Sequence, residues 1–263
     1  MRIALSIAGS DPTGGAGLQA DLQVFRALGV HGAGVVTALT VQDTAVVHRV
    51  LPAFPNVVLE QIRALLDDVT PDAVKLGMLA SDDVARSVQL GLEQLDPARG
   101  VPIVIDPVLA ASDGTALLER RAWPTLEHLI GRASIVTPNL PEAAALTGCD
   151  VSTREGVEAA AASLVTNLGA NAVLVTGGHN DGAPDDLLAL RTGGSASFEW
   201  LAGERVETGP VHGTGCALAS AITAHLARGA ALGDAVGAAR AFVARALRGA
   251  RASGSRARLL DYS

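Results

Sequence analysis

Short apolar runs alternate with segments of helical periodicity along most of the sequence, and this alternation restricts the possible folds more than any other feature. The first run is IALSIAG at 3–9, and a helical segment at 16–29 follows it. Further runs lie at 33–42, 72–79, 101–109, 133–138 and 171–178, with helical segments at 55–69, 81–95, 122–131, 140–148 and 152–169. Strands separated by helices in this order predict a parallel sheet with helices on both faces.

The last third of the sequence departs from this alternation. The turn-rich stretch 178–210 contains DDLLALRT at 185–192 and SASFEW at 195–200, which predict antiparallel strands at an edge of the sheet. Two closing helices are expected at 215–228 and 233–249. The sequence thus predicts an α/β fold of three layers, α/β/α, with a mostly parallel central sheet and antiparallel edge strands.

The length of 263 residues suits one large domain better than two small ones. Apolar residues make up 49% of the chain but aromatic residues only 3%, so the core is expected to consist mainly of Ala, Val, Leu and Ile. We expect this domain to span 1–250. The tail at 251–263 is interrupted by Gly and Ser, and we expect it to be loosely ordered.

The net charge of −7 argues against a nucleic acid or an anionic membrane as a partner, because both need clustered Lys and Arg. A phosphate group must therefore be held locally. No apolar stretch approaches the roughly 18 residues of a membrane span. The two cysteines, Cys149 and Cys216, form neither a CxxC pair nor a disulfide framework, which indicates a reducing cytoplasm.

Two loops after predicted strands carry residues suited to a ligand site, since ligands bind at the carboxyl ends of parallel strands. GSDPTGGAG at 9–17 either offers free N–H groups to an anion or is a tight turn that needs glycine. Asp21, in the helix that follows, either accepts hydrogen bonds from a small polar ligand or lies on a solvated face. In VIDPV at 104–108, Asp106 ends a buried strand and offers the hard oxygen ligand that Mg²⁺ prefers.

A third loop, TPNLPEA at 137–143, places Asn139 and Glu142 three residues apart at a helix start. They form either a capping pair, or a site at which Glu142 holds Mg²⁺ through water. The stretch GTGC at 213–216 begins the helix expected at 215–228, where glycines and the helix dipole make an anion pocket without Lys or Arg. Cys216 lacks the neighbours of a zinc or redox site, so it is either a plain buried cysteine or part of this pocket.

Together these stretches resemble the ribokinase-like superfamily, and within it the hydroxymethylpyrimidine/phosphomethylpyrimidine kinases of thiamine biosynthesis. The matching stretches, in chain order, are IAGSDPTGGAGLQADL, TALTVQDT, KLGML, IDPV, TPNLPEAAALTG, TGGH and HGTGCALASAI. The resemblance implies a ribokinase-like sandwich that phosphorylates 4-amino-5-hydroxymethyl-2-methylpyrimidine with ATP and Mg²⁺. In the family the monophosphate is usually phosphorylated again.

The resemblance also implies roles for residues on the substrate side. Asp21 and Gln42 are expected to hydrogen-bond the aminopyrimidine edge. Gly9 and Met78 are expected to line the ring pocket, and Val108 to close it.

On the phosphate side, the resemblance implies that Asp106 and Glu142 organise Mg²⁺ and that Asn139 and Thr176 contact the nucleotide. The catalytic loop is then formed by Gly213, Thr214, Gly215 and Cys216, whose glycines and threonine hold phosphate oxygens. Cys216 occupies the position where much of the superfamily has a catalytic Asp. A helix N-terminus can lower a thiol pKa from about 8.5, so a thiolate base near neutral pH is one hypothesis.

The sequence departs from the family pattern near the expected phosphate path. Ala111 and Thr176 stand where the family often has lysines, and the Gly/His-rich ending of the family is missing. Because the monophosphate brings extra negative charge to this place, we expect the protein to phosphorylate the alcohol better than the monophosphate.

Two other functions compete with this prediction. One is a pyridoxal, pyridoxine or pyridoxamine kinase of the same superfamily, since some of these share the GTGC loop; Gln42 favours the aminopyrimidine. The other is a non-catalytic sensor that binds the pyrimidine. The family usually forms small homo-oligomers, so a homo-oligomer is expected here, with a dimer favoured.

Overall fold

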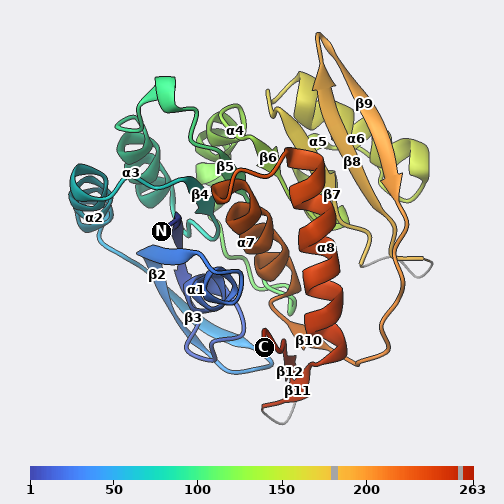
Figure 1. Ribbon diagram of the computed structural model, residues 1–263, viewed down its shortest axis with the longest axis horizontal. Coiled ribbons are helices and arrows are strands. Elements are labelled where there is room, and N and C mark those ends of the chain that lie inside the picture. Colours follow the sequence, from blue (N-terminus) through green and yellow to red (C-terminus); the bar gives the residue numbers. More distant parts are fainter. Residues whose placement is uncertain (179–182, 254–256) are drawn as a thin grey trace.

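A twisted sheet forms the centre of the computed structural model, which describes residues 1–178, 183–253 and 257–263 (Figure 1). Within the described residues the sheet has nine strands in the order β3-β2-β1-β4-β5-β6-β7-β8-β9. The strands are β1 Ile3–Ser10, β2 His31–Gln42, β3 Val47–Pro52, β4 Ala73–Leu76, β5 Ile103–Ile105, β6 Ile135–Val136, β7 Ala172–Val175, β8 Asp186–Thr192 and β9 Ser195–Leu201. The six strands β1, β2, β4, β5, β6 and β7 are parallel, while β3, β8 and β9 are antiparallel to their neighbours. The predicted mostly parallel sheet with antiparallel edge strands is confirmed.

Four strands of the sheet are shorter than the apolar runs that predict them, and β3 was not predicted. β4, β5, β6 and β7 cover only part of the runs at 72–79, 101–109, 133–138 and 171–178. At β5 and β6 prolines cause this, because Pro102 and Pro107 flank β5 and Pro138 follows β6, and a proline donates no ladder hydrogen bond. β3 forms the second edge of the sheet and pairs with β2.

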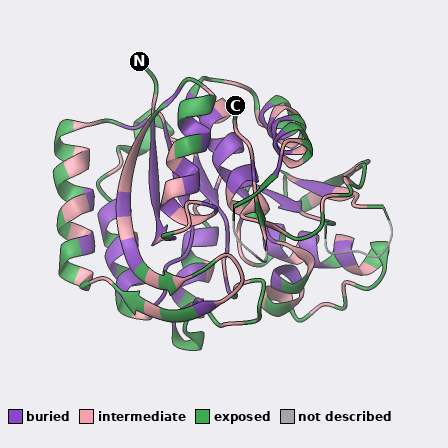
Figure 2. Cartoon of the chain, turned by 90° about the horizontal axis from the view of Figure 1, so that it is seen from below, coloured by how far each residue is buried: buried purple, intermediate pink, exposed green. Residues whose placement is uncertain are grey.

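Helices cover both faces of the sheet, as the α/β/α prediction requires. They are α1 Gly17–Ala27, α2 Pro55–Asp68, α3 Asp82–Leu92, α4 Trp123–Ile130, α5 Leu140–Thr147, α6 Arg154–Thr166, α7 Thr214–Ala227 and α8 Leu232–Arg248, with short 3-10 turns at Pro97–Arg99 and Arg120–Ala122. Most helices turn a buried side to the sheet and an exposed side outward (Figure 2). Residues 217–224 of α7 are all buried, because α1 and α8 pack against this helix. None of the described helices is long and apolar enough to cross a membrane.

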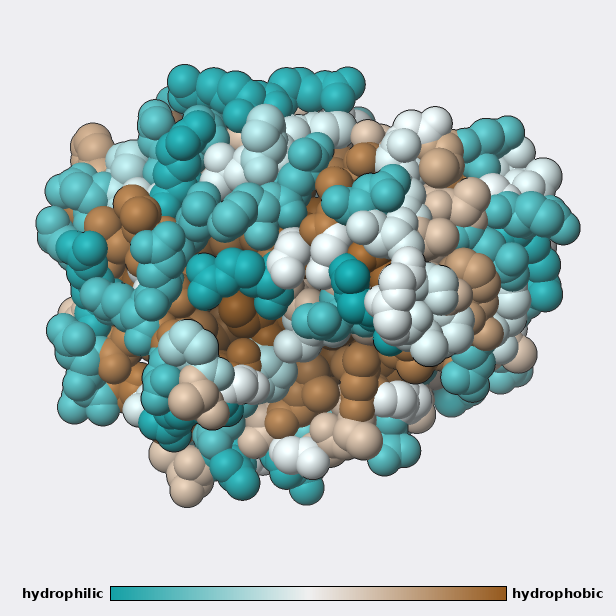
Figure 3. Space-filling model, turned by 90° about the horizontal axis from the view of Figure 1, so that it is seen from above, coloured by the Kyte–Doolittle hydropathy of each residue, from teal (hydrophilic) through white to brown (hydrophobic). Residues whose placement is uncertain are grey.

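The core has two main parts, one on each face of the sheet. Side chains of α2, α3, α4 and α6 pack in one part, and side chains of α1, α7 and α8 pack in the other. Successive side chains of a strand point to opposite faces of the sheet and so pack in different parts of the core. In β5, Ile105 packs in the part with α2, α3, α4 and α6, and Val104 packs in the part with α1, α7 and α8. Some apolar side chains stay at the surface, and the view from above shows them gathered in a hollowed band between hydrophilic rims (Figure 3).

The tail is less loose than the sequence suggests. In its described part, β11 Arg251–Ala252 and β12 Arg258–Leu259 form a small sheet with β10 Val211–His212, in the order β10-β12-β11. Leu260 is buried, and the ring of Tyr262 stacks on Phe242 with centroids 6.0 Å apart. The tail therefore packs against the strand that leads into the GTGC loop.

A buried ion pair connects one helical layer, through α1 and α7, to β1 and β4 of the sheet. Nζ of Lys75, the single lysine of the chain, lies 2.9 Å from each oxygen of Asp21, and both side chains are 0% exposed. Ser6 of β1 and Ser220 of α7 each donate a further hydrogen bond of 2.6 Å to Asp21. Asp21 thus lies neither on a solvated face nor against a ligand pocket, and its oxygens already have two donors each. This corrects the expectation that it binds the aminopyrimidine edge.

We predict that Lys75→Met lowers the free energy of unfolding by about 3–5 kcal/mol, because it leaves the Asp21 carboxylate buried without a counter-ion. The double variant Lys75→Met/Asp21→Asn should recover part of this loss, since a neutral amide can accept from one serine through its oxygen and donate to the hydroxyl oxygen of the other through its NH₂ group. Urea unfolding of the three proteins measures the differences. A Lys75→Met protein as stable as the wild type, or a double variant no better than the single one, would show that the pair does not hold these elements together.

Candidate active site

Asp106 is the central residue of the candidate site. It follows β5 directly, is 5% exposed, and interacts electrostatically with Glu142, Lys75 and Cys216. These four residues come from the ends of β4 and β5 and the first turns of α5 and α7. The structure therefore brings together three site residues predicted from separate motifs, Asp106, Glu142 and Cys216, and adds Lys75, which the sequence analysis did not single out.

The two carboxylates of the site are buried like charges. Burial raises the pKa of Asp106, and the charge of Lys75 only opposes this rise. Burial, with a further contribution from the charge of Asp106, raises the pKa of Glu142 to about 8. A divalent cation beside them would offset the unfavourable burial of two negative charges. The chemistry of these ligands therefore fits Mg²⁺.

The environment of this carboxylate pair fits an ion that keeps part of its water shell. Among the described residues, no three His, Cys, Asp or Glu side chains are grouped so as to hold a metal ion by themselves. Mg²⁺ is usually bound through one or two carboxylates, with water and substrate phosphate as the other ligands. Asp106 and Glu142 suit this mode.

The predicted capping pair is present at the start of α5. Asn139 accepts from the backbone N–H of Glu142, and Glu142 Oε2 accepts from the backbone N–H of Asn139, both at 2.9 Å. Glu142 also has a hydrogen bond from the backbone of Leu109. A carboxylate has about four lone-pair sites, so these two bonds and a metal role are compatible. Thr176 forms a bridge with Asn139, which places the two predicted nucleotide contacts side by side.

The GTGC loop approaches the first loop of the chain closely. Gly213 has a φ of 85°, and a Cβ built on it would lie 1.8 Å from the carbonyl oxygen of Gly15. Only glycine fits there. Gly213 caps α7, whose next residues Thr214 and Gly215 are partly or fully exposed. The first N–H groups of a helix have no partner within it, so these groups can donate to a phosphate.

The surroundings of Cys216 disfavour its thiolate form. Burial raises the pKa of Cys216, and the charges of Asp106 and Asp21 raise it further. The opposing influences, from Lys75 and from the backbone N–H of Gly17, are smaller than the effect of burial. This direction argues against the hypothesis of a thiolate base near neutral pH, because burial outweighs the position at the helix start.

The predicted substrate side divides into three parts. Gly9 packs against Met78, since a Cβ on Gly9 would lie 3.0 Å from the Met78 sulfur, and Val108 joins the same apolar cluster. Gln42 ends β2, and its terminal amide lies 3.0 Å from His212. Asp21 is apart from both, in the ion pair with Lys75.

Sequence reasoning missed Asp11 and His212, whose carboxylate and ring nitrogen lie 2.8 Å apart beside this site. Asp11 stands two residues before TGGAG and His212 directly before GTGC, but 201 positions separate them. No local pattern links residues at that distance. The polar character of each residue next to a glycine loop is the only signal that the sequence offers.

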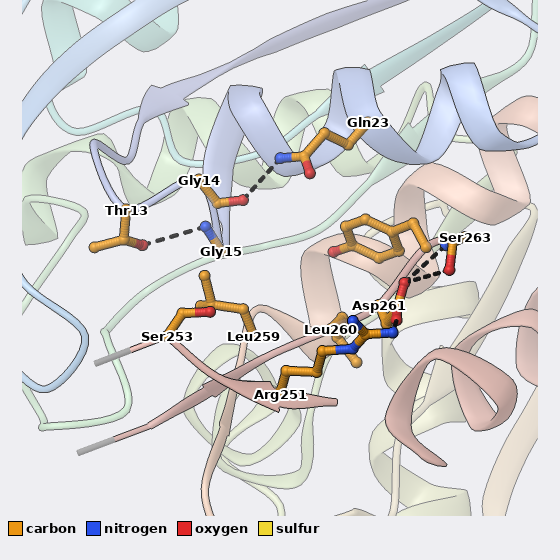
Figure 4. Close-up of a pocket in the computed structure, with 11 residues that line it drawn as sticks. Thr13, Gly14, Gly15, Gln23, Arg251, Ser253, Leu259, Leu260, Asp261 and Ser263 are labelled. Atoms are coloured by element: carbon orange, nitrogen blue, oxygen red, sulfur yellow. Dashed lines mark hydrogen bonds and ion pairs between the residues drawn. The ribbon is translucent and has the colours of Figure 1, made fainter. Parts of the chain in front are cut away.

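A cavity of about 420 Å³ lies between the first loop and the tail. Figure 4 shows Thr13, Gly14 and Gly15 on one side of it, and Arg251 and Asp261 on the other. The carboxylate pair and Cys216 do not line it. It is therefore a neighbour of the candidate site rather than the place of the chemistry.

Comparison with known proteins identifies relatives over nearly the whole chain. A family model described as phosphomethylpyrimidine kinase matches residues 11–260. A hydroxymethylpyrimidine/phosphomethylpyrimidine kinase of Rhizobium meliloti is 44% identical over 242 residues, which cover 92% of this chain and 88% of that protein. The residues matched by the family model include Asp106, Glu142 and Cys216.

Two solved structures share the fold. The crystal structure of a phosphomethylpyrimidine kinase from Clostridium difficile 630 has a TM-score of 0.81 and 34% identity, and covers 94% of this chain and 100% of its own. An ADP complex of Bacillus subtilis pyridoxal kinase has a TM-score of 0.87 and 31% identity, and covers 100% and 97%. The predicted ribokinase-like architecture is confirmed, and the chain belongs to the phosphomethylpyrimidine kinase family.

Proposed function

We propose that this protein is an ATP-dependent kinase that phosphorylates 4-amino-5-hydroxymethyl-2-methylpyrimidine in thiamine biosynthesis. One observation carries the proposal: a chain of this family places the buried pair Asp106 and Glu142 next to a glycine loop at the start of α7. Phosphoryl transfer requires a cation, which carboxylates can hold, and hydrogen-bond donors for the phosphate oxygens, which the backbone N–H groups can supply.

The mechanism depends on positioning. Asp106 and Glu142 would hold Mg²⁺, which would neutralise charge on the phosphate oxygens. The N–H groups at the start of α7 donate to the transferred phosphoryl group, and the Gly9 and Met78 side of the site holds the ring. Cys216 is protonated and small, so it contributes space and a weak hydrogen bond near the acceptor hydroxyl rather than a base. Phosphoryl transfer has a loose transition state, so these fixed donors suffice for most of the acceleration.

We predict that Cys216→Ser loses less activity than Asp106→Ala. Removal of a general base costs roughly 10²–10⁴-fold in rate, and the loss for Cys216→Ser should stay below that range. The measurement is kcat with saturating ATP and alcohol, with the melting temperature of each variant as a control for folding. If Cys216→Ser is the more damaging change in a folded protein, the thiol takes part in proton transfer and this account of the site is wrong.

We further predict that the alcohol is a better substrate than its monophosphate. The single lysine of the chain is engaged with Asp21, and Ala111 and Thr176 supply no charge where relatives often have lysine. ADP release with the alcohol, the monophosphate and pyridoxal gives kcat/KM for each. A clear preference for the monophosphate contradicts the prediction. Faster turnover of pyridoxal would assign the related pyridoxal kinase activity, and tight pyrimidine binding without ADP release would assign the non-catalytic sensor.

We also propose that the enzyme is a cytoplasmic homo-oligomer, with a dimer favoured. Its need for ATP and its two free cysteines support a reducing cytoplasm. On the β2–β3 edge, Leu39 and Leu51 face each other across the strands and are 54% and 41% exposed. Apolar side chains gathered on an exposed sheet edge are typical of contact surfaces.

Light scattering should show a dimer for the wild type and a smaller species for Leu51→Glu. Phe198→Glu is the matched control, because Phe198 is also 41% exposed but lies on β9 at the opposite edge. A dimer that survives Leu51→Glu would place the contact elsewhere, and a monomeric wild type would refute the oligomer.

A further inference from the structure

His212 connects three segments that meet at the candidate site. It ends β10, directly before Gly213, and its Nε2 lies 2.8 Å from Oδ2 of Asp11 in the first loop. The same nitrogen lies 3.0 Å from the amide nitrogen, Nε2, of Gln42, at the carboxyl end of β2. One ring nitrogen thus faces a carboxylate and an amide at once.

Asp11 can only accept hydrogen bonds in this arrangement. Oδ1 accepts from the backbone N–H of Thr13 at 2.8 Å, while Oδ2 accepts from the Thr13 hydroxyl and the backbone N–H of Ala16, both at 2.9 Å. Burial alone would raise the pKa of Asp11, but the hydrogen bonds from His212 and Thr13 outweigh it and lower the pKa. Asp11 is therefore a carboxylate, and Nε2 of His212 must carry the proton between them.

This proton decides which end of the Gln42 amide faces His212. A nitrogen that donates its hydrogen has no lone pair in the ring plane, so it cannot accept from an amide N–H. In the structure Nε2 of Gln42 lies against this N–H, which sets two donors against each other. A half-turn of the amide exchanges its nitrogen and oxygen and brings the oxygen to Nε2 of His212, where it shares the proton with Asp11. Its NH₂ group then points away from His212.

We propose that His212 is a positioning residue that fixes the Gln42 amide with its NH₂ group toward the substrate pocket, so that the site selects a heteroaromatic ring with an unprotonated nitrogen. The inference rests on the proposed function and deepens it. Gln42 is half-buried at the ligand edge of the sheet, and a pyrimidine ring nitrogen is an acceptor that suits an N–H donor. In the opposite orientation, the amide oxygen of Gln42 would face the ring nitrogen of the pyrimidine. Both atoms are hydrogen-bond acceptors, so neither would have a donor.

Packing keeps this arrangement rigid. A Cβ on Gly15 would lie 2.8 Å from Cδ2 of His212 and 2.5 Å from Cδ2 of Leu259, so the ring is held between the first loop and the tail. The residue after His212 is Gly213, which in turn touches Gly15. The orientation of Gln42 is thereby connected to the loop that receives the phosphate.

The test compares kcat/KM for the pyrimidine with kcat/KM for its two deaza analogues, in which one ring nitrogen is replaced by C–H. The wild type should disfavour one analogue by roughly 10- to 100-fold, the effect of a lost hydrogen bond that leaves a buried donor unpaired. His212→Phe keeps the ring volume but removes the N–H, and it should reduce that ratio to less than about threefold. His212→Gln places an N–H donor near the position of Nε2 and should retain most of the ratio.

Gln42→Leu should abolish the ratio on its own, and adding His212→Phe to it should change the ratio no further. Melting temperatures show whether each variant is folded. A His212→Phe protein with the wild-type ratio, or one equally slow with every substrate, overturns the inference, because a purely structural role lowers all rates alike. A wild type that phosphorylates the pyrimidine without distinguishing the analogues also overturns it and leaves the proposed function intact. A wild type that does not phosphorylate the pyrimidine refutes the proposed function, and the inference with it.

Discussion

The buried pair of Asp21 and Lys75 is the interaction on which the arrangement of the site depends. It connects α1 with β4, and through two serines it reaches β1 and α7. The positive charge of Lys75 also acts on Asp106 and Cys216, because it lowers the pKa of both groups and so opposes the effect of burial. Burial outweighs this effect at both groups. The site is thus organised around a fixed ion pair whose two side chains are fully buried.

Most of the fold follows from local patterns in the sequence. Apolar runs and helical periodicity reveal the order of the layers, because each strand and helix must bury its own side chains. Asp106 and Glu142 could be predicted as neighbours for the same reason, since both follow parallel strands whose carboxyl ends share one edge. The prolines around β5 and β6 are equally local, yet they shorten the strands below what the apolar runs suggest.

What escaped prediction involves pairs far apart in the sequence. Lys75 lies 54 residues from Asp21, and His212 lies 201 residues from Asp11. The residues next to a carboxylate in an early helix turn do not show whether it contacts solvent, a ligand or a lysine. The sequence therefore predicts a ligand as the partner of Asp21, whereas the structure pairs it with Lys75. The tail is a similar case: its Gly and Ser residues suggest disorder, but β12 gains a partner in β10, which only the folded chain brings near. Tertiary contacts decide such features, and composition does not contain them.

The reliance on backbone donors explains how an acidic chain with one lysine can serve as a kinase. The N–H groups at the start of α7 do not depend on side-chain identity. They depend on Gly213 and its φ of 85°, because any Cβ there would collide with Gly15. Substitutions such as Ala111 and Thr176 can therefore change which phosphate acceptor is preferred while the donors for the transferred group remain. The residues that cannot be exchanged without loss of the site are therefore the glycines, whose backbone geometry positions the N–H donors, and the carboxylates beside them.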